Sequence, residues 1–224
     1  MIIHTARHGQ PVLDSLPSGS DHEYPPGDFP LSALGRHQAE LLGTFLRSEG
    51  FHGKILSSPY LRTMETASIV AETCGLSVFP EPRIQERLFY PEPPCPGLNL
   101  EELKKLIANL DPAAELEYPW KIPKGIEPME DVGLRVHSFL DDLLANPPGN
   151  DVLLIGHGAT VHTIMQDLAD RAGFSGDVGR TWNCAVGSFE ADPDGTVRLL
   201  RTLYVDFIPV ESITSNRIRW SDLA

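Results

Sequence analysis

The sequence predicts an α/β protein with three layers, in which helices cover both faces of a mostly parallel central sheet. Short apolar runs, typical of buried strands, alternate along most of the chain with longer segments whose apolar residues recur at helical spacing. A length of 224 residues also suits one domain of this class with a sizeable core, and we place that domain at residues 1–224.

The expected strands are short apolar runs bounded by turn signals: "MIIHTA", "KILSS", "LSVFP", "DVLLIG", "AVGSFEA" and "VRLLRTLYV". Among them, "DVLLIG" carries the strongest signal for a buried strand. The last two flank the turn "DPDG" and are expected to pair as a hairpin.

The main helices are expected at four segments: residues 32–48, 58–74, 129–145 and 159–173. Ser32 is predicted to cap the first helix and Ser58 the second, with Pro59 in its first turn. Gly75 and Gly173 stand where the second and the last of these helices are expected to end.

Residues 82–128 differ in amino-acid composition from the rest of the chain. They hold nine of its 20 prolines, around one expected helix in "NLEELKKLIANL". Because their apolar content is thin, we expect a proline-rich cap or insertion rather than a second domain with its own core.

Bulk composition excludes several classes of function. A formal net charge of -13 argues against a general surface for nucleic acid or anionic membranes, so an anionic substrate must be attracted by a local basic cluster. The 3 cysteines form no C-x-x-C pair, which favours reduced thiols over a disulfide framework or a zinc site. Without a signal segment or a run long enough to span a membrane, we expect a cytoplasmic protein.

Two expected strands end on a histidine beside a glycine, in "TARHG" and "LLIGHG". If these strands are neighbours, His8 and His157 meet at the carboxyl edge of the sheet, where ligands of such folds bind. Gly9 and Gly158 are predicted to let the backbone approach a bound group closely. The second motif also leads into a helix, whose N-terminus favours an anion.

Two arginines are expected at the same edge. Arg7 precedes His8, and Arg62 falls in the first turns of the helix that follows "KILSS". Paired guanidinium groups suit bidentate recognition of phosphate. The combination therefore predicts a phosphate pocket with a nucleophilic histidine.

Each signal alone has a plainer interpretation. An Arg-His-Gly triplet is often a surface turn, and a single helix arginine is often solvated. "GHGATV" resembles the start of a dinucleotide fingerprint, but Val161 stands where its third glycine belongs. The remaining histidines, His4 among them, have no partner pattern and are expected to be structural or on the surface. It is the coincidence of three signals at strand ends that favours the phosphate site.

Five motifs occur in an order that resembles the histidine phosphatase superfamily, the phosphoglycerate-mutase-like group. They are "TARHGQ", "FPLSALGRHQAELLGTFL", "ILSSPYLRTMETA", "RIQERLFY" and "LLIGHGATVHTIM". The resemblance covers residues 2 to about 165, and it implies that superfamily's α/β/α fold.

The resemblance implies a role for each matching residue. His8 is the expected nucleophile that forms a phosphohistidine, and Arg7, Arg62 and His157 are expected to bind the transferring phosphoryl group. Glu86 matches the general acid that protonates the leaving oxygen and later acts as base towards water. No metal and no cofactor are expected, because the arginines neutralise the charge.

The resemblance covers both phosphatases and mutases, and we favour a phosphatase acting on small phosphate monoesters. A phosphoglycerate-type mutase and a non-catalytic phospho-ligand binding module are the alternatives; a phosphoprotein substrate and a homodimer stay open. The run "ERLFYPEPP" departs both from the sequence that follows the acid glutamate in the mutases and from the "W-E-G"-like run of many small phosphatases, so it leaves the substrate open. Gln10 is expected to contact substrate, while Phe89, Tyr90 and Trp120 are expected either to line an apolar leaving-group site or to pack within the cap.

Overall fold

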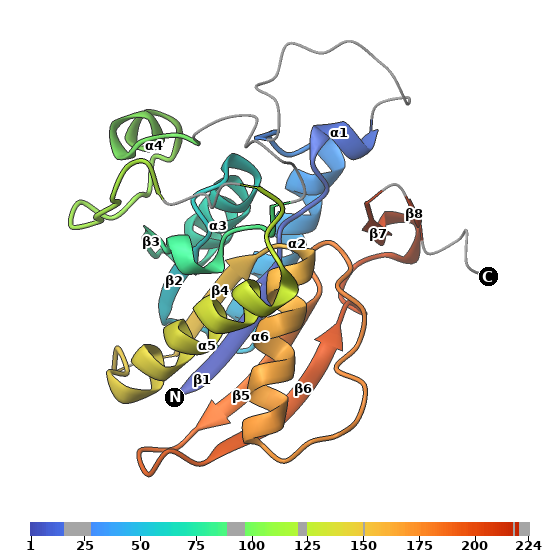
Figure 1. Cartoon of the computed structure of the whole chain (residues 1–224). Coiled ribbons are helices and arrows are strands. Elements are labelled where there is room, and N and C mark those ends of the chain that lie inside the picture. The colour runs from blue at the N-terminus through green and yellow to red at the C-terminus, as the bar shows by residue number, and fades with distance from the viewer. Residues whose placement is uncertain (16–27, 89–96, 121–124, 150, 217, 220–224) are drawn as a thin grey trace.

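The computed structural model describes residues 1–15, 28–88, 97–120, 125–149, 151–216 and 218–219 (Figure 1). Its centre is a six-stranded sheet in the order β3-β2-β4-β1-β5-β6. The strands are β1 (Ile2–Arg7), β2 (Lys54–Ser57), β3 (Val78–Pro80), β4 (Val152–Gly156), β5 (Val186–Ala191) and β6 (Val197–Tyr204).

The four strands β3, β2, β4 and β1 run parallel, and the β5–β6 hairpin adds two antiparallel strands at one edge. The predicted mostly parallel sheet and the predicted hairpin are both confirmed. Parallel neighbours need a crossover, and a helix supplies each one here.

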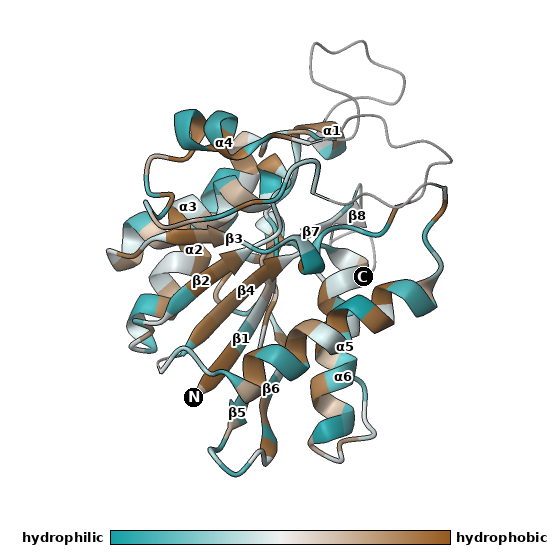
Figure 2. Ribbon diagram, turned by 60° about the vertical axis from the view of Figure 1, so that its left-hand side comes forward, coloured by the Kyte–Doolittle hydropathy of each residue, from teal (hydrophilic) through white to brown (hydrophobic). Residues whose placement is uncertain are grey.

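Helices cover both faces of the sheet (Figures 1 and 2). The main ones are α2 (Ala33–Ser48), α3 (Leu61–Cys74), α5 (Met129–Ala145) and α6 (Gly158–Arg171). Buried apolar side chains form two clusters. The α2–α3 cluster contains the inner faces of α2 and α3, and the α5–α6 cluster contains those of α5 and α6. The three-layer sandwich is therefore as predicted.

Strand β4 joins the two clusters. Leu153 and Ile155 face the α2–α3 cluster, whereas Val152 and Leu154 face the α5–α6 cluster, and all four are fully buried. Successive side chains of a strand point to opposite faces of the sheet, so one strand can supply residues to both clusters. Burying each such side chain contributes about 1.5–3 kcal/mol to the stability of the fold. This explains why "DVLLIG" is apolar throughout.

The predicted start of α3 is wrong by a few residues. The helix begins at Leu61 with Tyr60 as N-cap, and Ser58 does not cap it. The oxygen Oδ1 of Asp28 instead accepts the Leu61 N–H at 2.7 Å, so a carboxylate from a distant loop caps the helix. Ser58 is thereby left for His157, to which it is hydrogen-bonded.

Helix α4 (Leu100–Leu106) is shorter than its sequence pattern predicted. Asn99 and Glu102 form a capping box at its start. The chain leaves the helix at residue 107 because residues 109 and 111 bond to both sides of Val78 in β3. Leu103 and Ile107 are buried in the α2–α3 cluster, so this described part of residues 82–128 packs on the main core.

The sequence patterns missed several short elements: α1 (Val12–Ser15), the 3-10 turns η1 (Pro82–Ile84) and η2 (Val210–Ser212), and a small sheet of β7 (Thr214–Ser215) and β8 (Ile218–Arg219). Each is too short to show a hydrophobic period. Within the described ranges, no helix is both long and apolar enough to cross a lipid bilayer.

Candidate active site

The register of β1 and β4 brings the two predicted histidines together. These strands are parallel neighbours, with Arg7 opposite Gly156, so His8 and His157 leave the sheet side by side. Their ring centroids lie 5.2 Å apart, and both side chains are buried. The expectation that they meet at the carboxyl edge is confirmed.

His8 is held in one tautomer. Its Nδ1 lies 2.7 Å from the Gly9 carbonyl oxygen, an acceptor only, so Nδ1 carries the proton. Its Nε2 accepts from Nε of Arg62 at 3.3 Å and therefore presents a lone pair. Burial, and then the charges of Arg62 and Arg7, hold the His8 pKa well below 6.5, so the ring is neutral.

His157 is neutral for the same reasons. Burial, followed by the nearby Arg62 charge, holds its pKa well below 6.5. Its Nδ1 lies 3.0 Å from a terminal nitrogen of Arg62, which can only donate, so Nδ1 is unprotonated. The proton is then on Nε2, which donates to the Ser58 hydroxyl at 2.8 Å. Arg62 thus links both rings.

Glu86 lies beside this pair. Its Oε2 is 3.6 Å from Nδ1 of His157 and 3.9 Å from Arg62. Burial raises its pKa above the ordinary carboxyl value, although Arg62, Arg7 and the Arg87 N–H favour the charged form. A carboxyl with a raised pKa close to a nucleophilic ring is suited to general acid chemistry.

The Arg7 fork differs from the sequence expectation. We expected both arginine forks to be open to one anion, but the terminal nitrogens of Arg7 are bound by other groups. One donates to the Thr181 carbonyl and the Ser215 hydroxyl, both at 2.8 Å, and the other to Oδ1 of Asn216 at 2.6 Å. Its Nε is buried and has no hydrogen-bond partner among the described residues, so it is a donor available to a ligand.

Gly9 is needed for packing. A Cβ atom on it would lie 2.3 Å from the Gly35 carbonyl oxygen, so α2 can approach the loop only because no side chain is present. Its N–H donates to Thr66, so that amide is already paired. Gly158 opens α6, and a Cβ there would make ordinary contact with the Arg7 guanidinium at 3.8 Å.

Gln10 belongs to the same buried loop. Its side-chain oxygen accepts from the Ser32 hydroxyl at 2.8 Å, and its N–H donates to Gln38 at 2.8 Å. The Ser32 hydroxyl in turn accepts the Gly35 N–H as the predicted cap of α2. A substrate contact for Gln10 stays a prediction.

The segment that carries Glu86 is held by a buried ion pair that sequence reasoning missed. Arg135 in α5 binds both carboxylate oxygens of Glu127, at 2.7 and 3.0 Å. Glu127 also accepts the Leu88 N–H, and its backbone bonds to Leu88 and Arg87. No local pattern pairs residues 127 and 135 with the acid motif, so this support was invisible in the sequence.

Tyr60 connects the site to the described part of the insert. Its ring packs edge-on against both His157 and Trp120, with centroids 5.1 and 5.0 Å away, and Arg62 lies over its face at 4.7 Å. Trp120 is 1% exposed and donates to the carbonyl oxygen of residue 98. Trp120 is therefore packed against its neighbours, and its role in a leaving-group site stays a prediction. Phe89 and Tyr90 lie outside the described residues.

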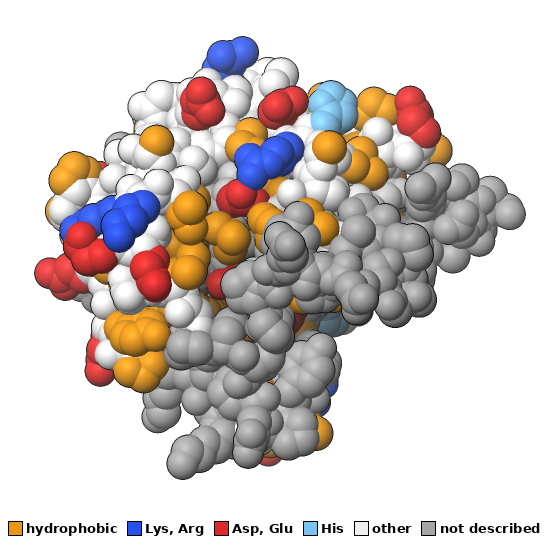
Figure 3. Space-filling model, turned by 90° about the horizontal axis from the view of Figure 1, so that it is seen from above, with side chains coloured by type: hydrophobic (Ala, Val, Ile, Leu, Met, Phe, Trp, Pro, Cys, Tyr) orange, Lys and Arg blue, Asp and Glu red, His pale blue; other side chains and the backbone are white. Residues whose placement is uncertain are grey.

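Positive charge for an anion is concentrated inside this site. Figure 3 looks down on the face where the parallel strands end, and it shows no continuous basic patch among the described side chains. Arg7 and Arg62 are 5% and 8% exposed, so their charges act at short range in a site with little water. In the described part of the chain, no group of three or more His, Cys, Asp or Glu side chains is arranged to hold a metal ion.

Comparison with known proteins identifies the family. A model of the histidine phosphatase superfamily (branch 1) matches residues 3–202. The chain belongs to this superfamily. Its sequence is 32% identical over 178 residues to the probable phosphoglycerate mutase GpmB of Yersinia enterocolitica, covering 74% of each protein. It is 31% identical over 170 residues to the protein of the same name from Yersinia pestis, again covering 74% of each.

Solved structures support the same fold at lower identity. The ecdysone phosphate phosphatase of Bombix mori, in complex with tungstate, superimposes with a TM-score of 0.66 at 19% identity, covering 100% of this chain and 99% of that one. A mycobacterial glucosyl-3-phosphoglycerate phosphatase gives a TM-score of 0.58 at 23% identity, covering 91% and 99%.

Proposed function

We propose that this protein is a phosphatase that hydrolyses phosphate monoesters through a phosphohistidine on His8. The observation that supports this most is the fixed tautomer of His8. The Gly9 carbonyl binds the Nδ1 proton, so the Nε2 lone pair is directed towards Arg62. A neutral, oriented imidazole next to buried arginines is a nucleophile placed beside an anion site.

In the first step, Nε2 of His8 attacks phosphorus, and the N–P bond forms as the bond to the leaving oxygen breaks. Glu86 gives its proton to that oxygen. Arg62 and the Nε of Arg7 stabilise charge on the phosphoryl oxygens. A bound dianion would also offset the arginine charges that keep His157 neutral, and so would favour its protonated form.

In the second step, a water molecule attacks the phosphorus of the phosphohistidine. The Glu86 carboxylate takes a proton from that water, the N–P bond breaks, and its electron pair returns to Nε2 of His8. Inorganic phosphate leaves, and the neutral ring and the protonated carboxyl are restored. The arginines supply the positive charge, so the proposal includes no metal or cofactor.

A phosphomutase is the second candidate, since both sequence relatives named above are called probable phosphoglycerate mutases. The two reactions share the first step and differ in which oxygen receives the phosphoryl group. The run after Glu86, "RLFYPEPP", lacks both the mutase pattern and the "W-E-G"-like run of many small phosphatases, so the acceptor is decided by experiment, and a phosphatase is our choice. We propose small phosphate monoesters as the substrate class, with a phosphorylated peptide as a further substrate to test.

Incubation with a panel of phosphate esters tests the proposal. We expect release of inorganic phosphate, and an alkaline quench should trap phosphate on His8. His8→Ala should abolish both, whereas His37→Ala, a histidine on the exposed side of α2, should change neither. An isomerised ester without phosphate release would indicate the mutase. Binding of phosphate esters without any turnover would indicate a non-catalytic module.

A further inference from the structure

The segment at residues 212–216 lies far along the chain from the site motifs, yet it bonds to the site at two places. We infer that this segment, with Asn183, is a positioning element that holds the Arg7 guanidinium and the His8 backbone in their working geometry. The inference rests on the proposed function, because it assigns these residues a role in phosphate binding and transfer.

The first connection fixes Arg7. The Ser215 hydroxyl, the Asn216 side-chain oxygen and the Thr181 carbonyl accept from its terminal nitrogens at 2.8, 2.6 and 2.8 Å. Three acceptors on one planar group leave the guanidinium a single orientation. In that orientation Nε has no hydrogen-bond partner among the described residues, so these residues turn this buried donor of Arg7 towards phosphate.

The second connection fixes the backbone of the nucleophile. Nδ2 of Asn183 donates to the His8 carbonyl at 2.9 Å, and the Thr214 hydroxyl donates to Oδ1 of Asn183 at 3.0 Å. The Thr214 hydroxyl in turn accepts from Gln38 at 2.9 Å, and the oxygen of that side chain accepts the Gln10 N–H at 2.8 Å. His8 and Gln10 are thus held from both sides by one network.

This network is buried and internally consistent. Asn183 and Gln38 are 0% exposed and Thr214 is 1% exposed. The Thr214 hydroxyl gives its one proton to Asn183 and accepts one from Gln38, so no two donors face each other. Such a network specifies one arrangement, because losing one member leaves a buried partner unpaired.

Asn216 and Ser215 offer the sharpest test, since Asn216 is exposed and its replacement does not open the core. We expect the double variant Ser215→Ala/Asn216→Ala to lower kcat/KM for a phosphate monoester about 10- to 100-fold, because the Arg7 fork is no longer oriented. Its affinity for inorganic phosphate should fall about tenfold while the protein stays folded, which a thermal melt checks. Ser215→Thr, with Asn216 unchanged, keeps both acceptors without adding a charge and should retain most of the wild-type activity.

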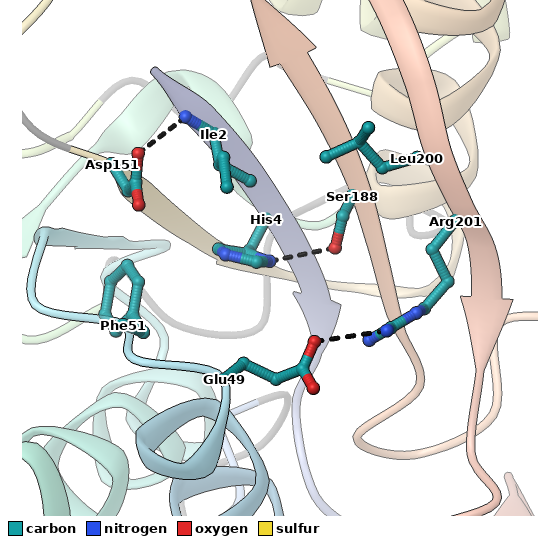
Figure 4. Close-up of a pocket in the computed structure, with 8 residues that line it drawn as sticks. All are labelled: Ile2, His4, Glu49, Phe51, Asp151, Ser188, Leu200 and Arg201. Atoms are coloured by element: carbon teal, nitrogen blue, oxygen red, sulfur yellow. Dashed lines mark hydrogen bonds and ion pairs between the residues drawn. The ribbon is translucent and has the colours of Figure 1, made fainter.

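The matched control is Ser188→Ala. Ser188 is a buried serine on β5 that bonds Nδ1 of His4 at 2.9 Å. It lies in a small pocket near the start of β1, lined by Ile2, His4, Glu49, Phe51, Asp151, Ser188, Leu200 and Arg201 (Figure 4). Its loss also removes one buried hydroxyl, but should leave kcat/KM and phosphate affinity unchanged.

Asn183→Ala tests the second connection. We expect a lower kcat with a smaller change in KM, because the nucleophile loses its placement while the arginines still bind phosphate. The inference is wrong if the Ser215/Asn216 double variant binds phosphate and turns over ester like the Ser188→Ala control. It is also wrong if Asn183→Ala changes only the melting temperature. If the wild-type protein shows no turnover, the phosphate titrations still test the Arg7 connection separately from the proposed function.

Discussion

At the scale of single residues, the chemistry of the site depends on which ring nitrogen and which carboxyl carry protons. The Gly9 carbonyl sets the tautomer of His8, and Arg62 sets that of His157. Burial raises the pKa of Glu86 while it lowers those of both histidines. The same desolvation therefore favours the protonated form of Glu86 and the neutral form of His8, which is the pairing that the proposed phosphoryl transfer needs.

Glu86→Gln tests the acid role. For an alkyl phosphate, whose leaving oxygen needs a proton, kcat/KM should fall about 100- to 1,000-fold. For p-nitrophenyl phosphate, whose leaving group is stable as an anion, the loss should be much smaller.

The pH profile gives the same test in the wild-type protein. Because the proposed acid role requires protonated Glu86, kcat/KM for the alkyl ester should fall as pH rises through the raised pKa of Glu86. For the nitrophenyl ester, this fall in kcat/KM at higher pH should be much smaller. Equal losses for both esters in the Glu86→Gln variant would contradict the assignment.

At the scale of elements, helix ends and loops are held by partners from elsewhere in the chain. Helix α3 begins without a side-chain cap of its own, and Asp28 supplies one from the loop that precedes α2. The α2 helix can pack on the loop after β1 because Gly9 has no side chain to meet the Gly35 carbonyl and Gly35 has none to meet the Gln10 carbonyl. The position of Arg62, in the first turn of α3, therefore depends on contacts that lie outside its own helix.

Asp28 makes stability depend on pH. Burial raises its pKa from 3.8 to about 6, against the opposing effects of the Leu61 N–H and Arg62. Between about pH 4 and 6 the unfolded chain is ionised at this residue while the folded one still holds its proton, so stability falls as pH rises across that window. Above about pH 6, ionised Asp28 lowers the free energy of unfolding by about 3 kcal/mol in total.

Asp28→Asn removes that cost. The stability of the variant relative to the wild type, from urea unfolding, should rise by about 3 kcal/mol between pH 4 and pH 7. Asp206→Asn, at an exposed position, is the control and should show no such trend. A difference that stays constant with pH would refute the role given to Asp28.

At the scale of the whole molecule, one sheet with two covered faces holds the fold together, and its carboxyl edge holds the site. The four buried residues of β4 contribute to both apolar clusters. Since β4 lies between β2 and β1, it also sets the spacing between the Arg62 helix and the His8 loop. Stability and site geometry therefore share this strand.

Leu154→Ala tests the importance of that strand. Leu154 is 0% exposed, and the variant should lose about 2–5 kcal/mol of unfolding free energy in urea. Leu134→Ala, which truncates a leucine of α5 that is 64% exposed, should lose less than about 0.5 kcal/mol. Similar losses in the two variants would show that the two clusters do not carry the stability.

Local patterns in the sequence were sufficient for the elements and for the residues at their ends. "DVLLIG" and "MIIHTA" predicted two buried strands, which the structure places side by side, and the motifs after the strands predicted His8, His157 and Arg62 at one edge. These signals are readable because burial, capping and turn preferences act over a few residues. Residues with no such local signal, such as Asn183 and Glu127, were missed.

The sequence by itself determined the fold class, the family and the residues that carry the candidate chemistry, because each depends on periodicity or on a short motif. Only the tertiary structure decided how those residues are held. In the structure Asp28 caps α3, Ser215 and Asn216 accept from the guanidinium of Arg7, and Asn183 donates to the backbone carbonyl of His8. The physical reason is range: these hydrogen bonds join segments up to 209 residues apart, and no local preference encodes such a pairing.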